Sequence, residues 1–320
     1  MTEFGYTLMG EQAPPTQLVD DAIRAERVGF DFAVVSDHYN PWLNEQGHSP
    51  YAWSVLGAAA YTTSRIGLMS FVTCPIGRYH PAVVAQKAAT VGVMSEGRFT
   101  LGLGAGENLN EHAVGAWPHV AHRHAMLVEA IEIIRPLLAG ETVHFGGDYF
   151  QVPEARLWDR PPDGVPIGVA VSGPSSCELA GEYADALIAT EPEPELFEQF
   201  DAAGGAGKPR YGQVPLCYGP DEAACRRTVH EQFRWTGLGW PVNAELPGPV
   251  SFERASASVR EEDVAELVSY GPDLDRHVEA VRRYIDAGFT HVAVVQVGAQ
   301  GQAGFLDFAE KELLPALRAL

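Results

Sequence analysis

Short apolar runs alternate with longer amphipathic segments along nearly the whole chain. The run from Phe32 to Val35 contains no polar residue, which is typical of a strand buried on both faces of a parallel sheet. Seven further runs predict strands over residues 4–9, 66–72, 99–103, 165–171, 186–190, 212–218 and 292–297. The segments between them predict helices over residues 14–28, 51–61, 82–94, 121–138, 175–183, 195–203, 221–235, 274–287 and 305–317.

This alternation predicts the fold class. Eight strands followed by helices favour an α/β fold of the (β/α)8 TIM-barrel type over an open doubly wound sheet. The open sheet remains the alternative, although no strong GxGxxG motif follows the first strand. Two segments interrupt the alternation: a β-hairpin near residues 142–152, and a long loop near residues 236–262 of the kind that forms lids or linkers. We expect a single domain over residues 1–320.

Composition and charge narrow the classes of partner. The chain has 320 residues, of which 46% are hydrophobic and 20% charged, and its net charge is −20. Such a charge repels a nucleic-acid backbone, and no cluster of lysine and arginine offsets it. No apolar run approaches the ~20 residues of a membrane span, and the first residues lack the features of a signal peptide. We therefore expect a cytoplasmic protein that binds neither nucleic acid nor membrane.

Cysteines and histidines give no metal-binding pattern. The four cysteines form no CxxC pair, so we expect them to be reduced and mostly buried, with Cys74 set apart because it lies next to a candidate functional loop. His122 and His124 lie at the start of a predicted helix and are interpreted as solvated. We predict no metal site.

Residues that carry chemistry follow the second predicted strand. Asp37, His38 and Trp42 come within seven residues of its end, and loops after the strands of a (β/α) barrel form its catalytic face. A carboxylate beside a histidine can fix its tautomer and raise its pKa, which suits the histidine to proton transfer near neutral pH. The alternative is that Asp37 and His38 only cap the next segment.

Three further strand ends carry unusual residues. Residues 72–78 follow the third strand, residues 104–110 include Gly104, Gly106 and Glu107, and residues 171–176 form a turn of small residues before a helix. The glycines allow close approach of a ligand or merely turn the chain, and Glu107 is either functional or a solvated loop acid. The small turn offers free N–H groups to an anion, or is an ordinary helix cap. All four ends meet on one rim of a barrel.

Together these motifs resemble a known family. The segments 36–42, 106–111 and 172–174 are similar to those of the luciferase-like (bacterial luciferase superfamily) flavin and deazaflavin oxidoreductases. More narrowly, they resemble the subgroup that contains the glucose-6-phosphate dehydrogenases dependent on coenzyme F420, and the similarity spans nearly the whole chain. The resemblance implies an F420-dependent oxidoreductase that transfers a hydride between F420 C5 and a small organic substrate with an alcohol, carbonyl or sugar-type carbon. An FMN-dependent monooxygenase of the same family is one alternative, and a cofactor-carrying subunit with a degenerate site is another.

The resemblance also implies roles for individual residues. Asp37 would contact the deazaflavin, His38 would be the acid/base, Trp42 would wall the substrate pocket and Glu107 would exchange a proton near the ring. A non-prolyl cis peptide is expected at Phe71-Val72 or a neighbouring bond. The expected cofactor-binding residues are Asp37, Phe71, Val72, Cys74, Gly106, Glu107, Asn110, Val171, Ser172 and Gly173.

The chain departs from the sugar-phosphate enzymes at their phosphate clamp. Where cationic side chains hold the phosphate in those enzymes, this chain has Glu193, Leu246 and Leu267. A carboxylate at such a position repels a phosphate, so we expect a substrate other than glucose 6-phosphate. A phosphate site rebuilt from other cations, such as Arg254, Arg260 or Lys208, is the alternative. The resemblance and the apolar residues of the second and third helices further imply a homodimer.

Overall fold

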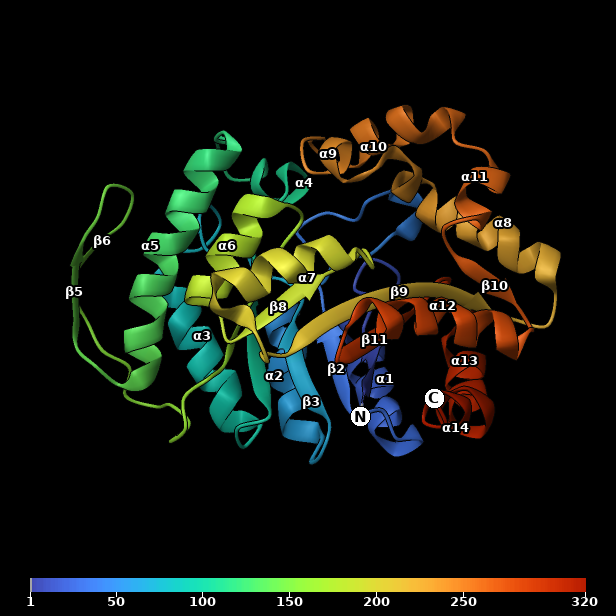
Figure 1. Ribbon diagram of the computed structural model, residues 1–320, viewed down its shortest axis with the longest axis horizontal. Helices are drawn as coiled ribbons and strands as arrows, with labels where there is room; N and C mark the ends of the chain where they lie inside the picture. The colour runs from blue at the N-terminus through green and yellow to red at the C-terminus, as the bar shows by residue number, and fades with distance from the viewer. Residues whose placement is uncertain (1) are drawn as a thin grey trace.

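The computed structural model describes residues 2–320, in which eight parallel strands close into a barrel (Figure 1). The strands are β1 (Glu3–Thr7), β2 (Phe32–Val35), β3 (Gly67–Ser70), β4 (Phe99–Leu103), β7 (Ile167–Ala170), β8 (Ala186–Ala189), β9 (Arg210–Tyr218) and β11 (His291–Gln296). Each pairs with the next in this order, and β11 pairs with β1, which closes the ring. The predicted (β/α)8 TIM barrel is confirmed.

Helices follow the strands and surround the barrel (Figure 1). They are α1 (Pro15–Val28), α2 (Ala52–Thr62), α3 (Pro81–Met94), α5 (Val120–Ala139), α6 (Pro174–Tyr183), α7 (Pro194–Phe200), α8 (Glu222–Phe233), α12 (Leu274–Ala287), α13 (Gln302–Phe308) and α14 (Leu314–Leu317). Prolines start α1, α3, α6 and α7, where the missing N–H costs nothing. Glycines in the left-handed conformation end α1, α5 and α12.

The predicted hairpin is present. Strands β5 (Val143–Gly146) and β6 (Gln151–Ala155) pair antiparallel and stand outside the barrel against α5 (Figure 1). The Glu129 carboxylate on α5 accepts hydrogen bonds from the backbone N–H groups of Asp148, Tyr149 and Phe150, which fixes the tip of the hairpin.

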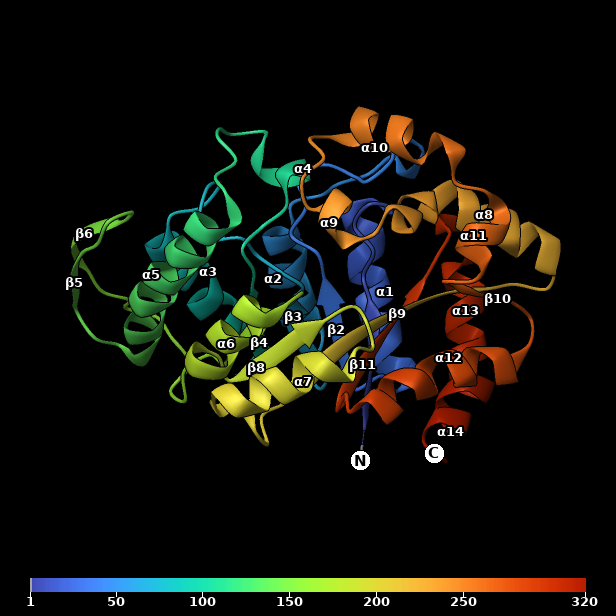
Figure 2. The ribbon, with the colours of Figure 1, turned by 45° about the horizontal axis from the view of Figure 1, so that its top comes forward.

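The prediction of a long loop over residues 236–262 is wrong. This segment contains the short helices α9 (Trp240–Asn243), α10 (Pro249–Ala255) and α11 (Glu261–Ala265), and it leads to a strand that the sequence did not predict, β10 (Ser269–Gly271), which extends the sheet beside β9. The short helix α4 (Asn108–Glu111) was also not predicted, and α9 lies beside it in both ribbon views (Figures 1 and 2). The insertion is ordered because Phe252 and Val264 bury apolar side chains in it.

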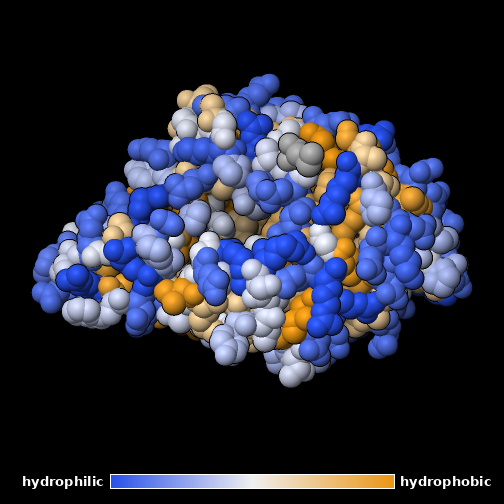
Figure 3. All heavy atoms as spheres, turned by 90° about the horizontal axis from the view of Figure 1, so that it is seen from below, coloured by the Kyte–Doolittle hydropathy of each residue, from blue (hydrophilic) through white to orange (hydrophobic). Residues whose placement is uncertain are grey.

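Apolar side chains fill the barrel and the layer under its helices. Phe32, Val34, Met69, Ile188 and Ala293 pack together in the interior of the ring. Figure 3 shows one face of the molecule, where hydrophilic residues dominate and apolar residues form small separate groups. Among the described residues, no helix combines the length and the apolarity that crossing a membrane requires.

Candidate active site

A histidine between two glutamates forms the centre of the site. His38 follows β2, Glu11 follows β1 and Glu107 follows β4, so three strand ends supply the group. The His38 Nδ1 atom lies 2.5 Å from Glu11 Oε1, an ion-pair contact without hydrogen-bond alignment. The His38 Nε2 atom lies 3.4 Å from Glu107 Oε2. The predicted meeting of His38 and Glu107 at one rim is therefore observed.

The surroundings shift the pKa values of both predicted acid/base groups. Burial disfavours the imidazolium of His38, but the charges of Glu11 and Glu107 outweigh it and raise the His38 pKa above its ordinary 6.5. Burial also raises the pKa of Glu107, although His38 opposes the change. A carboxyl group and an imidazole with raised pKa values in contact can hold and exchange a proton near neutral pH.

Sequence reasoning missed Glu11. It stands in the segment Gly10-Glu11-Gln12, where no neighbouring residue suggests chemistry, yet its side chain is buried against His38. The one signal in the sequence was its position just after the first apolar run. Had the strand-end argument been applied to β1 as it was to β2, Glu11 would have been a candidate.

Trp42 forms an aromatic wall beside His38. The two rings meet edge to face with their centroids 5.2 Å apart. The indole of Trp42 stacks on that of Trp235 at 4.0 Å, and Phe252 meets it edge-on at 5.1 Å. Phe252 belongs to the insertion and Trp235 directly precedes it, so the region after α8 completes this wall. The predicted role of Trp42 as a wall of the substrate pocket stays a prediction.

Asp37 lies after β2, as predicted, and its side chain is held by other residues of the protein. Its side chain is 1% exposed, and both carboxylate oxygens are engaged within the protein. Oδ2 accepts hydrogen bonds from the Trp53 indole at 3.0 Å and the Thr73 hydroxyl at 2.8 Å, and Oδ1 accepts one from the Tyr79 hydroxyl at 3.1 Å. The Arg78 guanidinium lies 3.6 Å away. Asp37 therefore joins the loops after β2 and β3, and contact with a cofactor remains a prediction that this burial weakens.

Removal of this carboxylate is expected to destabilise the fold. Asp37→Ala would leave the Trp53, Thr73 and Tyr79 donors without their acceptor and Arg78 with Glu111 as its remaining carboxylate partner, which costs about 3–5 kcal/mol of unfolding free energy. Urea unfolding followed by circular dichroism measures this cost. Asp307→Ala, which removes an exposed ion pair with Arg24, is the matched control and should cost at most about 1 kcal/mol. Equal urea midpoints for the two variants would show that the Asp37 carboxylate does not stabilise the fold.

The predicted cofactor residues Phe71, Val72 and Cys74 lie after β3, and Gly106 lies after β4. The peptide bond between Phe71 and Val72 is cis, as predicted. A Cβ atom on Gly104 would lie 2.7 Å from Val72 Cγ2, and one on Gly106 would lie 2.5 Å from the buried Cys74 sulfur. The side chains of Val72 and Cys74 fill the space beside these two residues, so the loops after β3 and β4 pack this closely only because both residues are glycine. Burial holds the pKa of the Cys74 thiol well above its usual range, so this thiol stays protonated.

The turn after β7 offers polar backbone groups. Ser172 and Gly173 donate their N–H groups to the Ser176 hydroxyl, and Val171 before them is buried. Helix α6 then begins with Pro174, which has no N–H, and without a side-chain cap, so the N–H groups of Ser175 and Ser176 are the first that the helix can offer to an anion such as the phosphate of a cofactor.

Asn110 organises the loops around Glu107. Its Oδ1 atom accepts hydrogen bonds from the N–H groups of Tyr39 and Asn40, and its Nδ2 atom donates to Glu107 Oε2 at 3.1 Å. The side chain is buried, so Asn110 positions Glu107 and the loop after β2. Cofactor contact by Asn110 itself stays a prediction.

The three positions of the expected phosphate clamp hold no cation. Glu193 is exposed and precedes α7 on the loop after β8, where it also raises the pKa of Glu191, though less than burial does. Leu246 packs against the aromatic wall around Trp42, whereas Leu267 is exposed. This part of the rim is acidic and apolar.

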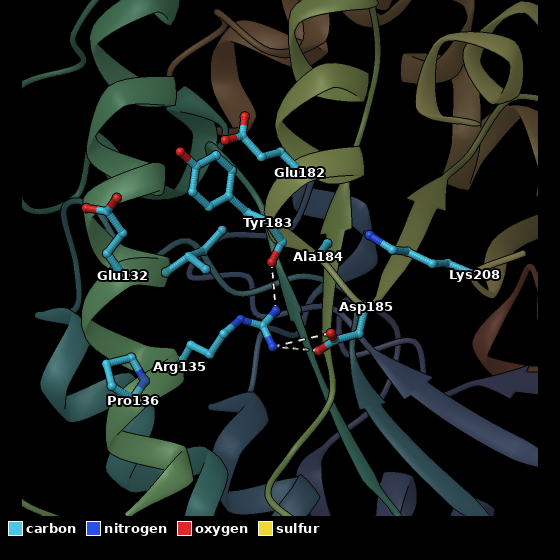
Figure 4. Close-up of a pocket in the computed structure, with 9 residues that line it drawn as sticks. Glu132, Arg135, Pro136, Glu182, Tyr183, Ala184, Asp185 and Lys208 are labelled. Atoms are coloured by element: carbon cyan, nitrogen blue, oxygen red, sulfur yellow. Dashed lines mark hydrogen bonds and ion pairs between the residues drawn. The ribbon is translucent and has the colours of Figure 1, made fainter. Parts of the chain in front are cut away.

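A separate cavity of about 390 Å³ lies on the outside of the barrel between α5 and the end of α6 (Figure 4). Arg135 there donates hydrogen bonds to Asp185 and to the Tyr183 carbonyl, and Lys208 donates to the Gly181 carbonyl. The two cations of this cavity are thus engaged. Asp185 in its lining directly precedes β8, so the cavity lies at the end of the barrel opposite the catalytic rim. Within residues 2–320, no group of three or more His, Cys, Asp or Glu residues could hold a metal ion.

The sequence and the structure are both similar to those of known proteins. Residues 1–291 match the family model described as luciferase-like monooxygenase. The F420-dependent glucose-6-phosphate dehydrogenase of Intrasporangium calvum is 37% identical over the full length of both chains. That of Microbacterium testaceum is 38% identical over 98% of this chain and 97% of its own. The structure of an F420-dependent secondary alcohol dehydrogenase with an F420-acetone adduct has a TM-score of 0.90, with 31% identity and 99% of each chain covered.

Proposed function

Because the chain belongs to the luciferase-like monooxygenase family, we propose that it is an oxidoreductase that exchanges a hydride between coenzyme F420 and a carbon of a small neutral alcohol or ketone. Dependence on F420 is supported by the relatives, and the first N–H groups of α6 suit the phosphate of such a cofactor. When bound, F420 supplies or accepts the hydride at its C5 atom.

One observation carries the proposal: His38 lies between Glu11 and Glu107 and beside the Trp42 wall. In alcohol oxidation, the imidazole of His38 takes the hydroxyl proton as the hydride leaves, and in ketone reduction it returns that proton. Glu11 stabilises the imidazolium form, and the half-buried Glu107 on the other side of the ring is placed to exchange a proton with it. The aromatic wall keeps water away from the reacting carbon.

The pH dependence of the reaction tests the role of Glu11. Glu11→Gln removes a charge that raises the His38 pKa, so the limb of the kcat/KM profile governed by His38 should move to lower pH. Measurement of kcat/KM for alcohol oxidation across the pH range checks this shift. Glu45→Gln, which removes an exposed carboxylate near Arg234, should leave the limb in place. If this limb of the kcat/KM profile does not move in Glu11→Gln, Glu11 and His38 do not act together in acid/base chemistry.

The substrate class rests on the rim beyond the aromatic wall. Leu246 adds to the apolar surface around Trp42. Glu193 brings a negative charge to the loop after β8, at the same end of the barrel. An apolar wall and an acidic rim suit a neutral substrate and disfavour a phosphate. A sugar phosphate is the alternative that the relatives' names suggest.

A homodimer through α2 and α3 is part of the proposal. Of the apolar residues expected on this face, Val83 and Val93 are each 45% exposed. The others are buried in the chain's own core: Trp53, Val55, Leu56, Val84 and Val91. Tyr61 and Met94 add to this exposed apolar surface, which is typical of an interface. Light scattering at micromolar concentration should give twice the 34.6 kDa chain mass. A double Val83→Glu, Val93→Glu variant should be monomeric, and a monomeric wild-type protein would contradict the proposal.

A further inference from the structure

The backbone that carries Trp42 is held by a glutamine outside the proposed chemistry. Gln46 is buried at the end of a short turn (Asn44–Gln46), and its Oε1 atom accepts hydrogen bonds from the N–H groups of Trp42 at 2.9 Å and Leu43 at 3.2 Å. Two bonds to one acceptor fix the path of the chain at the tryptophan. The indole beside His38 therefore depends on this side chain for its position.

The other end of Gln46 reaches the helix that leads to the second indole. Its Nε2 atom donates to the carbonyl of Gln232 at 3.1 Å, in the last turn of α8. Trp235 follows three residues later and stacks on Trp42 at 4.0 Å with the planes 6° apart. One side chain thus joins the two backbone segments that carry the stacked pair.

A second glutamine, Gln12, connects Gln232 to the segment that carries Glu11. Gln12 is buried, its Oε1 atom accepts a hydrogen bond from the Gly298 N–H at 2.9 Å, and its Nε2 atom lies 3.4 Å from Gln232 Oε1 as donor. Gln12 directly follows Glu11, whose carboxylate contacts His38. Gln232 is therefore joined to both segments that flank His38.

We propose that Gln12, Gln232 and Gln46, which we term the glutamine bridge, are positioning residues that set Trp42 and Glu11 on either side of His38. This inference rests on the proposed function. An amide is suited to the task because it donates and accepts at once and carries no charge, so it can order the loops without moving the His38 pKa. Misplacement of a reacting group by about 1 Å can cost roughly 100-fold in rate, so a positioning role predicts a kinetic effect at a distance.

The test uses the full-length protein and Gln46→Met, which keeps the volume of the side chain and removes its hydrogen bonds. Stacked indoles give an exciton couplet in circular dichroism, and we expect the variant to lose most of that couplet before any cofactor is added. With F420 and an alcohol, kcat should fall about 10- to 100-fold, with the Kd for F420 within about threefold and the pH limb unchanged. Gln46→Glu keeps the acceptor alone and should lie between wild type and Gln46→Met.

Glu45→Gln is the matched control, since Glu45 also joins this turn to the insertion, through Arg234, but does not touch the Trp42 backbone. It should leave the couplet and kcat unchanged. If Gln46→Met fails to fold, Gln12→Met removes the other half of the bridge. A couplet equal to wild type, or a lost couplet with kcat within twofold, would overturn the positioning role. A wild-type protein with a couplet but no activity with F420 would instead overturn the proposed function.

Discussion

Replacement of His38 by alanine is expected to lower turnover by about 10²- to 10⁴-fold, the usual contribution of a general acid/base. The Kd for F420 should stay within about threefold, because the predicted cofactor contacts at Gly106, Val171 and Ser172 lie on other strand ends. Stopped-flow reduction of F420 by an alcohol gives the rate, and fluorescence titration gives the affinity.

A matched substitution shows whether the effect of His38→Ala is specific to that histidine. His122→Ala removes an exposed imidazole on α5 and should leave both constants unchanged. If His38→Ala abolished F420 binding while the bound fraction turned over normally, His38 would be a cofactor ligand and not the acid/base.

Glucose 6-phosphate is expected to be a very poor substrate. Each charge-assisted contact to a phosphate contributes about 1.5–3 kcal/mol, so loss of two or three costs roughly 3–9 kcal/mol. Such a loss moves a micromolar Michaelis constant beyond the measurable range. The positions that would supply these contacts hold Glu193, Leu246 and Leu267, none of them a cation. F420 reduction with millimolar glucose 6-phosphate, beside a neutral secondary alcohol, measures the difference.

Charge reversal at the rim sharpens this experiment. Glu193→Lys should raise kcat/KM for the sugar phosphate and leave that for the neutral alcohol nearly unchanged. Glu195→Lys introduces the same charge in the first turn of α7 and should have the smaller effect if Glu193 alone borders the substrate. Efficient oxidation of glucose 6-phosphate by the wild-type protein would mean that Arg254 or Arg260 rebuilds a phosphate site. Lys208, the third cation considered, lies at the opposite face of the barrel and donates to the Gly181 carbonyl.

The sequence predicted the parts of the fold and site that depend on local pattern. The barrel followed from eight apolar runs, and the meeting of His38, Trp42 and Glu107 followed from the rule that strand ends share one rim. The ordered insertion was missed because its short helices are stabilised by long-range contacts, such as that between the Asn108 N–H and the Ala244 carbonyl, and not by periodicity.

Two residues of the site show why the rest could not be predicted. Glu11 has no sequence neighbour that indicates its role, and the pairing of β1 with β2 brings it to His38. Asp37 has the pattern of a functional residue, but its three hydrogen-bond donors come from Trp53, Thr73 and Tyr79, which are 16 to 42 residues away. Partners at such a distance decide whether a carboxylate is exposed to a ligand or buried in the fold.

Reduction of F420 by a neutral secondary alcohol tests the central claim most directly. Purified protein is mixed with F420 or with FMN, the affinity of each is titrated by fluorescence, and propan-2-ol is then added while ketone formation is followed. We predict binding of F420 in the micromolar range, loss of its fluorescence on addition of the alcohol, and one ketone formed per F420 reduced. Binding of FMN in preference to F420, with oxygen consumed and no ketone formed, would contradict the account.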